Sequence, residues 1–243
     1  MTGPTIDLPV PERALAVGAH PDDIEFGCGA TLAKWAAAGC AIAHLVCTDG
    51  SKGSWDPAQD TAALVAVRRD EQRAAALALG GTGEVTFLSW TDGELEAGLR
   101  QRWEVAYHIR RLRPVVVLGH DPWKRYRLHP DHRAAGFLVT DGIVAARDPH
   151  FFPEQAAPPH RPASLLLWEA DEPDHVEATE EWVDTKVAAL LAHRSQFRST
   201  MGIDSGGDHE IAAFRNTVRE RSAADGALAG LAHGEAFKRI DRL

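Results

Sequence analysis

Two short segments of the chain carry side chains that can bind a metal ion or transfer protons. The first reads HPDD and lies in ALAVGAHPDDIEFGCG, residues 14–29, and the second reads HPDH, residues 129–132. Each segment holds histidine and aspartate three positions apart or two histidines at that spacing, which places both side chains on one face of a helical turn. The candidate residues are His20, Asp22, Asp23, His129, Asp131 and His132.

The chemistry available to these residues is that of a metal site or of acid–base catalysis. Two histidines and one carboxylate, with the fourth position open, form a known catalytic zinc arrangement. The remaining carboxylates would overfill such a site, so one of them suits the role of a general base toward water. Spacing alone does not decide whether His129 or His132 is the metal ligand. A G-x-G-x-x-G phosphate loop, as in a dinucleotide-binding protein, is absent from the first turn.

The elements that must position these residues alternate between strand and helix over the first 146 residues. Small apolar runs bounded by glycine predict buried strands, and apolar residues at a 3.6-residue period predict helices. The expected strands are 13–19, 41–48, 84–89 and 115–119, and the expected helices are 27–38, 58–79, 97–112 and 132–146. This alternation predicts an α/β fold, Rossmann-like and doubly wound, with a mostly parallel sheet and helices on both faces.

The common doubly wound strand order, 3-2-1-4-5, makes the first and fourth strands neighbours. The HPDD turn follows the first strand and the HPDH loop follows the fourth, so the two segments are expected to meet across one crevice. The rest of the chain is less regular, with a proline-rich surface segment at 147–163. A fifth strand is expected at 164–170, and helices at 180–194, 208–223 and 231–240. We expect residues 1–243 to form a single domain, with a core at 1–146 and a C-terminal part at 147–243.

Composition and charge exclude several classes of function. The net charge is −9 and no basic block occurs, so nucleic acid is not an expected partner. No apolar run is long enough for a membrane span, and no signal-peptide pattern is present. The three cysteines form no C-x-x-C pair and predict reduced thiols in a cytoplasmic protein. The expected partner is a small molecule, and a homo-oligomer remains open.

The chain resembles the PIG-L/LmbE-like N-acetylglucosaminyl deacetylases. AHPDDIEFGCGATL is similar to the family signature A-H-P-D-D-x-E-x-G-x-G-G-x-L, and HPDH is similar to its second motif. The resemblance covers about residues 12–140, with weaker echoes in HRSQ (193–196) and EAFKRI (235–240). It implies a Zn²⁺-dependent hydrolase, with another divalent metal possible, that removes the N-acetyl group of an N-acetylglucosamine-type sugar or glycoside.

The resemblance also implies a role for each candidate residue. His20, Asp23 and His132 would bind the metal, and Asp22 would be the general base. His129 would stabilise the oxyanion or protonate the leaving amine, with Asp131 orienting it. Two further family positions would face the substrate, and these are Arg68, in the helix 58–79, and Asp92, in SWTDGEL. The other histidines considered are expected to be surface or structural residues: His108, His120, His150, His160 and His175.

Two alternative functions stay open at this point. A sister amidase would act on a thiol-glycoside conjugate or an antibiotic glycoside, and the sequence does not reveal the size of the substrate. A sugar-binding protein without activity would keep the fold and a vestigial site. The presence of every polar residue of both motifs argues against that second alternative.

Overall fold

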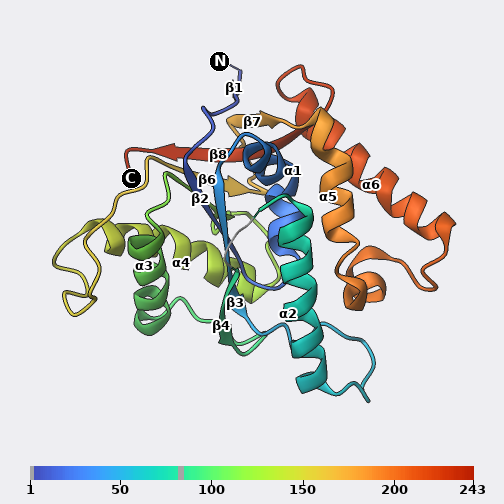
Figure 1. The fold of residues 1–243 in the computed structure, drawn as a ribbon, viewed down its shortest axis with the longest axis horizontal. Coiled ribbons are helices and arrows are strands. Elements are labelled where there is room, and N and C mark those ends of the chain that lie inside the picture. The colour runs from blue at the N-terminus through green and yellow to red at the C-terminus, as the bar shows by residue number, and fades with distance from the viewer. Residues whose placement is uncertain (1–2, 82–84) are drawn as a thin grey trace.

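The computed structural model describes residues 3–81 and 85–243, and its centre is one eight-stranded sheet with the strand order β1-β7-β8-β6-β5-β2-β3-β4 (Figure 1). The strands are β1 (Thr5–Ile6), β2 (Arg13–Gly18), β3 (Ala41–Thr48), β4 (Val85–Trp90), β5 (Val116–His120), β6 (Ser164–Trp168), β7 (His175–Ala178) and β8 (Gly234–Asp241). The α-helices are α1 (Asp23–Ala37), α2 (Thr61–Ala78), α3 (Leu99–Leu112), α4 (Pro130–Arg147), α5 (Val183–Leu190) and α6 (Asp208–Ala227).

The five central strands confirm the predicted fold class and strand order. In the sheet β4, β3, β2, β5 and β6 are consecutive neighbours and all parallel, which is the order 3-2-1-4-5. Val17 of β2 pairs with Gly119 of β5, so these two strands end at the same edge of the sheet. The HPDD and HPDH segments leave the sheet at this edge, as the sequence predicts.

Three further strands, β1, β7 and β8, join this sheet in an arrangement that the sequence did not predict. We expected a helix at 231–240, which is wrong, because Gly234–Asp241 is strand β8 and runs antiparallel to both β6 and β7. Phe237 of β8 pairs with Trp168 of β6 and is fully buried. The helix propensity of these residues has little influence on their secondary structure, because β8 forms backbone hydrogen bonds with a strand on each side.

The other boundaries agree with the predictions to within a few residues, with two exceptions. The first helix begins at Asp23 rather than at residue 27, and the helix expected at 180–194 is a short 3₁₀ turn followed by α5. The strand expected at 84–89 is β4, and residue 84 lies outside the described residues. Within the described residues no helix has the length and apolar character needed to cross a membrane.

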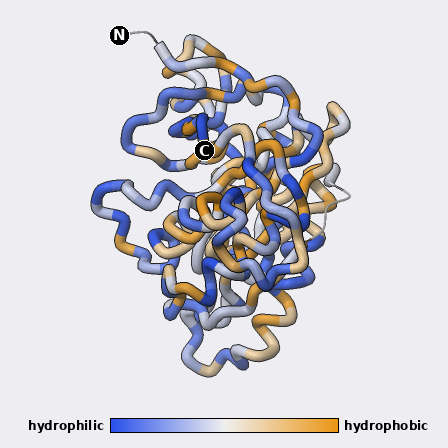
Figure 2. The backbone as a smooth tube through the Cα atoms, turned by 90° about the vertical axis from the view of Figure 1, so that its left-hand side faces the viewer, coloured by the Kyte–Doolittle hydropathy of each residue, from blue (hydrophilic) through white to orange (hydrophobic). Residues whose placement is uncertain are grey.

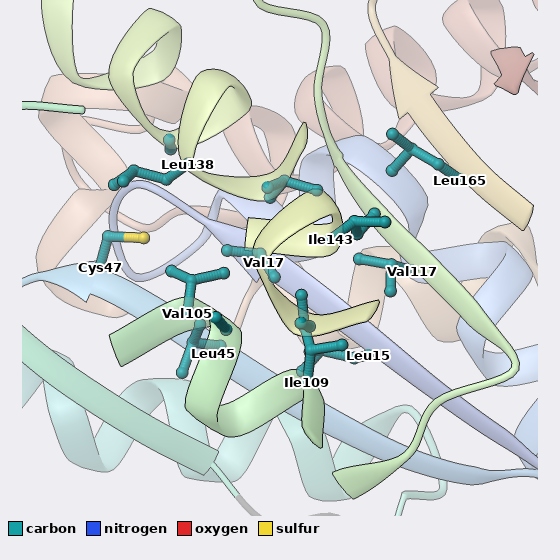
Figure 3. Close-up of a cluster of buried hydrophobic side chains, with 14 of the residues drawn as sticks. Leu15, Val17, Leu45, Cys47, Val105, Ile109, Val117, Leu138, Ile143 and Leu165 are labelled. Atoms are coloured by element: carbon teal, nitrogen blue, oxygen red, sulfur yellow. The ribbon is translucent and has the colours of Figure 1, made fainter. Parts of the chain in front are cut away.

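Helices cover both faces of the sheet and enclose two hydrophobic cores. α3 and α4 lie on one face, and α1, α2 and α5 lie on the other (Figure 1). Figure 3 shows the first core, where strand residues meet residues of α3 and α4: Leu15, Val17, Leu45, Val105, Ile109, Leu138 and Ile143. Hydrophobic segments lie mainly toward the interior and outer loops are more hydrophilic (Figure 2). Burial on both faces explains why the central strands are almost wholly apolar.

Helix α1, which begins inside the HPDD segment, is kinked, and a carboxylate from β8 caps the part after the kink. Cys28 has a non-helical φ of −151°, and the helix restarts just after it. The amides of Ala30 and Thr31 then donate to the carboxylate of Glu235 at 3.0 and 2.7 Å, as at an N-cap. The indole of Trp168 lies against Gly27, where a Cβ atom would come within 2.4 Å of the ring. The kink therefore lets β6 and β8 approach the start of α1 closely.

Candidate metal centre and active site

The two His/Asp segments meet at the carboxyl ends of β2 and β5. Asp22 is the N-cap of α1 and Asp23 is its first residue, while His129 is the N-cap of α4. Pro130 occupies the first turn of α4, where its missing amide hydrogen is not needed. The loops thus place two helix N-termini, with their histidines and aspartates, on either side of one site.

The Asp23 carboxylate lies between the imidazoles of His20 and His132. Its Oδ2 is 3.2 Å from Nδ1 of His20, and its Oδ1 is 3.3 Å from Nε2 of His132. Ligand atoms bound at about 2.0–2.1 Å by tetrahedral zinc lie roughly 3.3 Å apart, so each separation has the size expected between two ligands of one ion, and the two involve different oxygens of Asp23. Among the described residues, His20 and His132 share one group of donor atoms within 4.8 Å of one another, and Asp23 and His132 share another, but no such group contains all three residues. One such group contains His129, so distance alone does not exclude it as a ligand.

Asp23 is held in this position by groups behind it. The backbone amide of His20 donates to Asp23 Oδ2 at 2.7 Å, and Nε2 of His120 lies 3.3 Å from the same oxygen. Trp168 in turn donates from its indole to Nδ1 of His120 at 3.0 Å. Despite burial, His132 and His120 hold the pKa of Asp23 well below its usual value. His120 was expected to be a surface or structural residue, but it contacts Asp23, and its position as the last residue of β5 could have indicated this.

The second ring nitrogen of His20 faces two carboxylates. Its Nε2 is 3.1 Å from Asp131 Oδ2 and 3.2 Å from Asp92 Oδ1. Burial opposes protonation of His20, but these carboxylates and Asp23 together raise its pKa well above the usual value. A carboxylate on the far nitrogen of a histidine fixes the ring and its tautomer at metal sites.

Asp131 and Asp92 also make contacts that the sequence did not predict. Asp131 was expected to orient His129, but its oxygens accept from the amides of Gly93 and Leu95 and contact His20 instead. Asp92 was expected at the substrate, yet it is 5% exposed, and its second oxygen accepts from the amide of Lys52 at 2.9 Å. Both carboxylates thus support His20 from behind.

Asp22 is the carboxylate that these contacts leave available for proton transfer. Burial raises the pKa of Asp22 to about 6, while the guanidinium of Arg68 opposes this rise. Nη2 of Arg68 lies 3.7 Å from Asp22 Oδ1. Arg68 was expected to face the substrate, but it is 3% exposed and donates to the carbonyls of Pro21 and Gly50. It therefore braces the HPDD turn.

His129 lies at the exposed side of the cluster. Its ring centroid is 4.6 Å from that of His20 and 4.7 Å from that of His132. Burial lowers its pKa, and the neighbouring His20 and His132 lower it further. His129 is thus placed where it can meet a bound molecule.

Arg127 is a further member of the site that the sequence did not reveal. Its side chain is buried, and Nη1 lies 3.2 Å from His132 Nδ1 and 2.8 Å from Glu169 Oε2. Nothing in the local sequence distinguishes it from its neighbours Arg125 and Arg133, because its contacts come from the end of β5, from α4 and from the residue that follows β6.

Comparison with known proteins decides the family. The GlcNAc-PI de-N-acetylase family, PIG-L, matches residues 15–143, which contain both segments. The chain belongs to the PIG-L family. It is 31% identical to the diacetylchitobiose deacetylase of Thermococcus kodakarensis over 189 residues, which cover 76% of this chain and 70% of that protein. The N,N'-diacetylchitobiose deacetylase of Pyrococcus horikoshii has a similar structure, with a TM-score of 0.85 and 26% identity over 95% of this chain and 84% of that one.

The fold of this PIG-L protein also occurs in an enzyme with a different reaction. The 4-carboxy-2-hydroxymuconate hydratase of Pseudomonas putida matches with a TM-score of 0.75 and 21% identity, over 96% of this chain and 97% of that one. This likeness shows the fold alone. The fold alone therefore does not determine the reaction of the present protein, which depends on the residues of its site.

Proposed function

We propose that this PIG-L protein is a zinc-dependent deacetylase that hydrolyses the N-acetyl group of an N-acetylglucosamine-type sugar or glycoside. The observation that carries the proposal is the Asp23 carboxylate, 3.2 Å from His20 and 3.3 Å from His132, with the buried Asp22 carboxylate next to it in sequence. Two imidazoles, one carboxylate and an adjacent proton acceptor are the components of metal-assisted hydrolysis.

The residues that would hold the metal are His20, Asp23 and His132. Their mixed nitrogen and oxygen donors suit zinc, and other divalent first-row metals also accept such a set. A bound divalent ion supplies Lewis acidity to a water molecule and to the amide carbonyl. Asp131 and Asp92 hold His20 by its far nitrogen, and His120 holds Asp23, so all these supports act to keep the ligands in place.

Asp22 would accept a proton from the attacking water. Its carboxylate is buried, and Arg68 at 3.7 Å favours the ionised form that a base requires. After attack on the acetyl carbon, the nitrogen of the sugar must leave as an amine and needs a proton. Asp22, now protonated, can return that proton.

His129 would face the oxygen of the tetrahedral intermediate. It is the exposed histidine of the cluster, and its ring lies within 5 Å of the rings of His20 and His132. From there it can donate a hydrogen bond to the developing negative charge or a proton to the amine. Its role requires no direct partner in Asp131, whose contacts lie with His20.

The sugar part of the proposal rests on the related proteins, whose names give diacetylchitobiose as the molecule that they deacetylate. The test is acetate release from N,N'-diacetylchitobiose and from simple N-acetylglucosaminides, each with and without a metal chelator. We expect release that the chelator abolishes and added zinc restores. A matched O-acetylated glucoside distinguishes amide hydrolysis from general esterase activity. If acetate appears only from the ester, or if the protein hydrates an unsaturated carboxylate instead, the proposal is wrong.

A further inference from the structure

Helix α2 forms hydrogen bonds with both polar groups of the peptide unit between Pro21 and Asp22. The carbonyl oxygen of Pro21 accepts from Nη2 of Arg68 at 2.6 Å, and the amide of Asp22 donates to Oε1 of Gln72 at 3.0 Å. Arg68 and Gln72 are four residues apart, so they lie on one face of α2, and both are buried. One helix face thus fixes the plane of the single peptide unit that precedes the proposed general base.

That peptide plane determines the backbone conformation of Asp22, which is unusual. Asp22 has φ 100° and ψ −26°, in the left-handed region that residues other than glycine rarely adopt. Such a conformation persists only where surrounding contacts impose it, and it is common at functional sites. Released from its contacts, the residue would relax toward negative φ and the carboxylate would change direction relative to His20 and Asp23.

The direction of the Gln72 amide is set by Glu25. Nε2 of Gln72 donates to Oε1 of Glu25 at 2.7 Å and lies 3.3 Å from Nδ1 of His44, so both of these contacts are on the nitrogen side of the amide. The carbonyl oxygen of Gln72 must therefore face Asp22. Glu25 is fully buried on α1, and its second oxygen lies 3.3 Å from Nε2 of His193, which is also fully buried. His193 begins the HRSQ segment, so this distant part of the chain supports the same contact.

We infer that Arg68 and Gln72 are positioning residues that aim the Asp22 carboxylate, with Glu25 fixing the polarity of Gln72. The inference rests on the proposed role of Asp22 as general base. In this inference Arg68 binds backbone carbonyls of the enzyme and not the substrate. It also gives a function to two buried polar residues that contact neither the proposed metal ligands nor solvent.

The first test is Gln72→Leu, which removes the acceptor and keeps an apolar side chain of similar size. A misdirected base typically reduces turnover by about ten- to hundredfold, so we expect kcat to fall by that factor. KM and the metal content should stay near those of the wild type, and a crystal structure of the variant should show Asp22 with negative φ. The control is Gln155→Leu, since Gln155 is also buried and bonded at both ends, to Arg110 and Trp103. That variant should lose stability but keep kcat.

The second test exchanges the two partners and guards against misfolding of the first variant. Gln72→Glu alone sets two carboxylates face to face, so both kcat and Tm should fall. Adding Glu25→Gln restores one donor between them and leaves an acceptor for the Asp22 amide, so the double variant should recover much of both. Three results would each overturn the inference. The first is an unchanged kcat in Gln72→Leu, and the second is a φ of Asp22 that remains near 100° in the structure of that variant. The third is a double variant whose kcat and Tm are no higher than those of Gln72→Glu. If the wild type releases no acetate, the proposed function fails. The φ of Asp22 in Gln72→Leu still decides whether the contacts of Arg68 and Gln72 impose the conformation of Asp22.

Discussion

The Asp131 carboxylate lies 3.1 Å from Nε2 of His20, although 111 residues separate them in the sequence. This contact joins the HPDH segment to the HPDD segment directly, independently of any metal ion. It directs Nδ1 of His20 toward Asp23, and backbone amides of Gly93 and Leu95 hold the carboxylate from the other side. The second motif therefore supports a residue of the first and also contains the proposed ligand His132.

Asp131→Asn should weaken metal binding without removing a ligand. Losing the carboxylate partner of a metal-bound histidine typically costs about 10- to 100-fold in metal affinity. A zinc titration against a competing chelator measures this change. Asp141→Asn, on the same helix and paired with Arg102 at the surface, is the control and should bind zinc as the wild type does. Unchanged affinity together with a lower kcat would instead mean that Asp131 acts on His129, as the sequence had suggested.

Asp92→Ala should affect sugar and non-sugar substrates alike. Because Asp92 faces His20 at 3.2 Å and is almost fully buried, its loss should weaken metal binding and lower kcat/KM on both substrates by a similar factor. The comparison is between an N-acetylglucosaminide and a small acyclic N-acetyl amine at subsaturating zinc. A loss confined to the sugar, with the metal affinity unchanged, would show that Asp92 grips the sugar hydroxyls.

Asp23→Ala and His132→Ala should abolish stoichiometric metal binding, because each removes one of three donors. Elemental analysis of purified protein should find about one zinc per wild-type chain and far less in both variants. His129→Ala is the informative companion, since its ring also lies near His20 and His132. His129→Ala should keep its metal. If His129→Ala loses the metal and Asp23→Ala retains it, His129 would be the ligand and Asp23 would not.

Asp22→Asn should keep the metal and lose turnover. General bases commonly contribute about 10²–10⁴-fold, and the amide of asparagine cannot accept the proton. The measurement is kcat at saturating zinc, with metal content determined on the same sample. Activity within a few-fold of the wild type would place the base elsewhere.

The central fold could be predicted from the sequence because its signals are local. Runs such as ALAVG and VVVLG are short, apolar and followed by polar turns, and the alternation with helices limits the sheet to a few strand orders. Strand β8 could not be predicted in this way. Its residues 234–241 become a strand through pairing with β6 and β7, whose partner residues lie 56 or more positions earlier in the sequence, as at Ala178 and Gly234.

The meeting of the HPDD and HPDH segments at one edge of the sheet was predictable for the same reason. The residues of HPDD and HPDH sit in turns at strand ends, where their types alone indicate chemistry. Their supports could not be inferred, because His120, Arg127 and Gln72 acquire their roles from contacts across elements. Arg68 is the clearest example. The resemblance placed it near the site, but the sequence could not show that its guanidinium donates to the Pro21 carbonyl.

The most direct test of the account is to titrate zinc into metal-depleted protein while measuring acetate released from N,N'-diacetylchitobiose. We predict no release without metal, a rise that saturates at about one zinc per chain, and no comparable rise in Asp22→Asn at the same zinc content. Acetate release that is independent of metal, or a fully loaded wild-type protein that releases none from any N-acetylglucosaminide, would contradict the central claim.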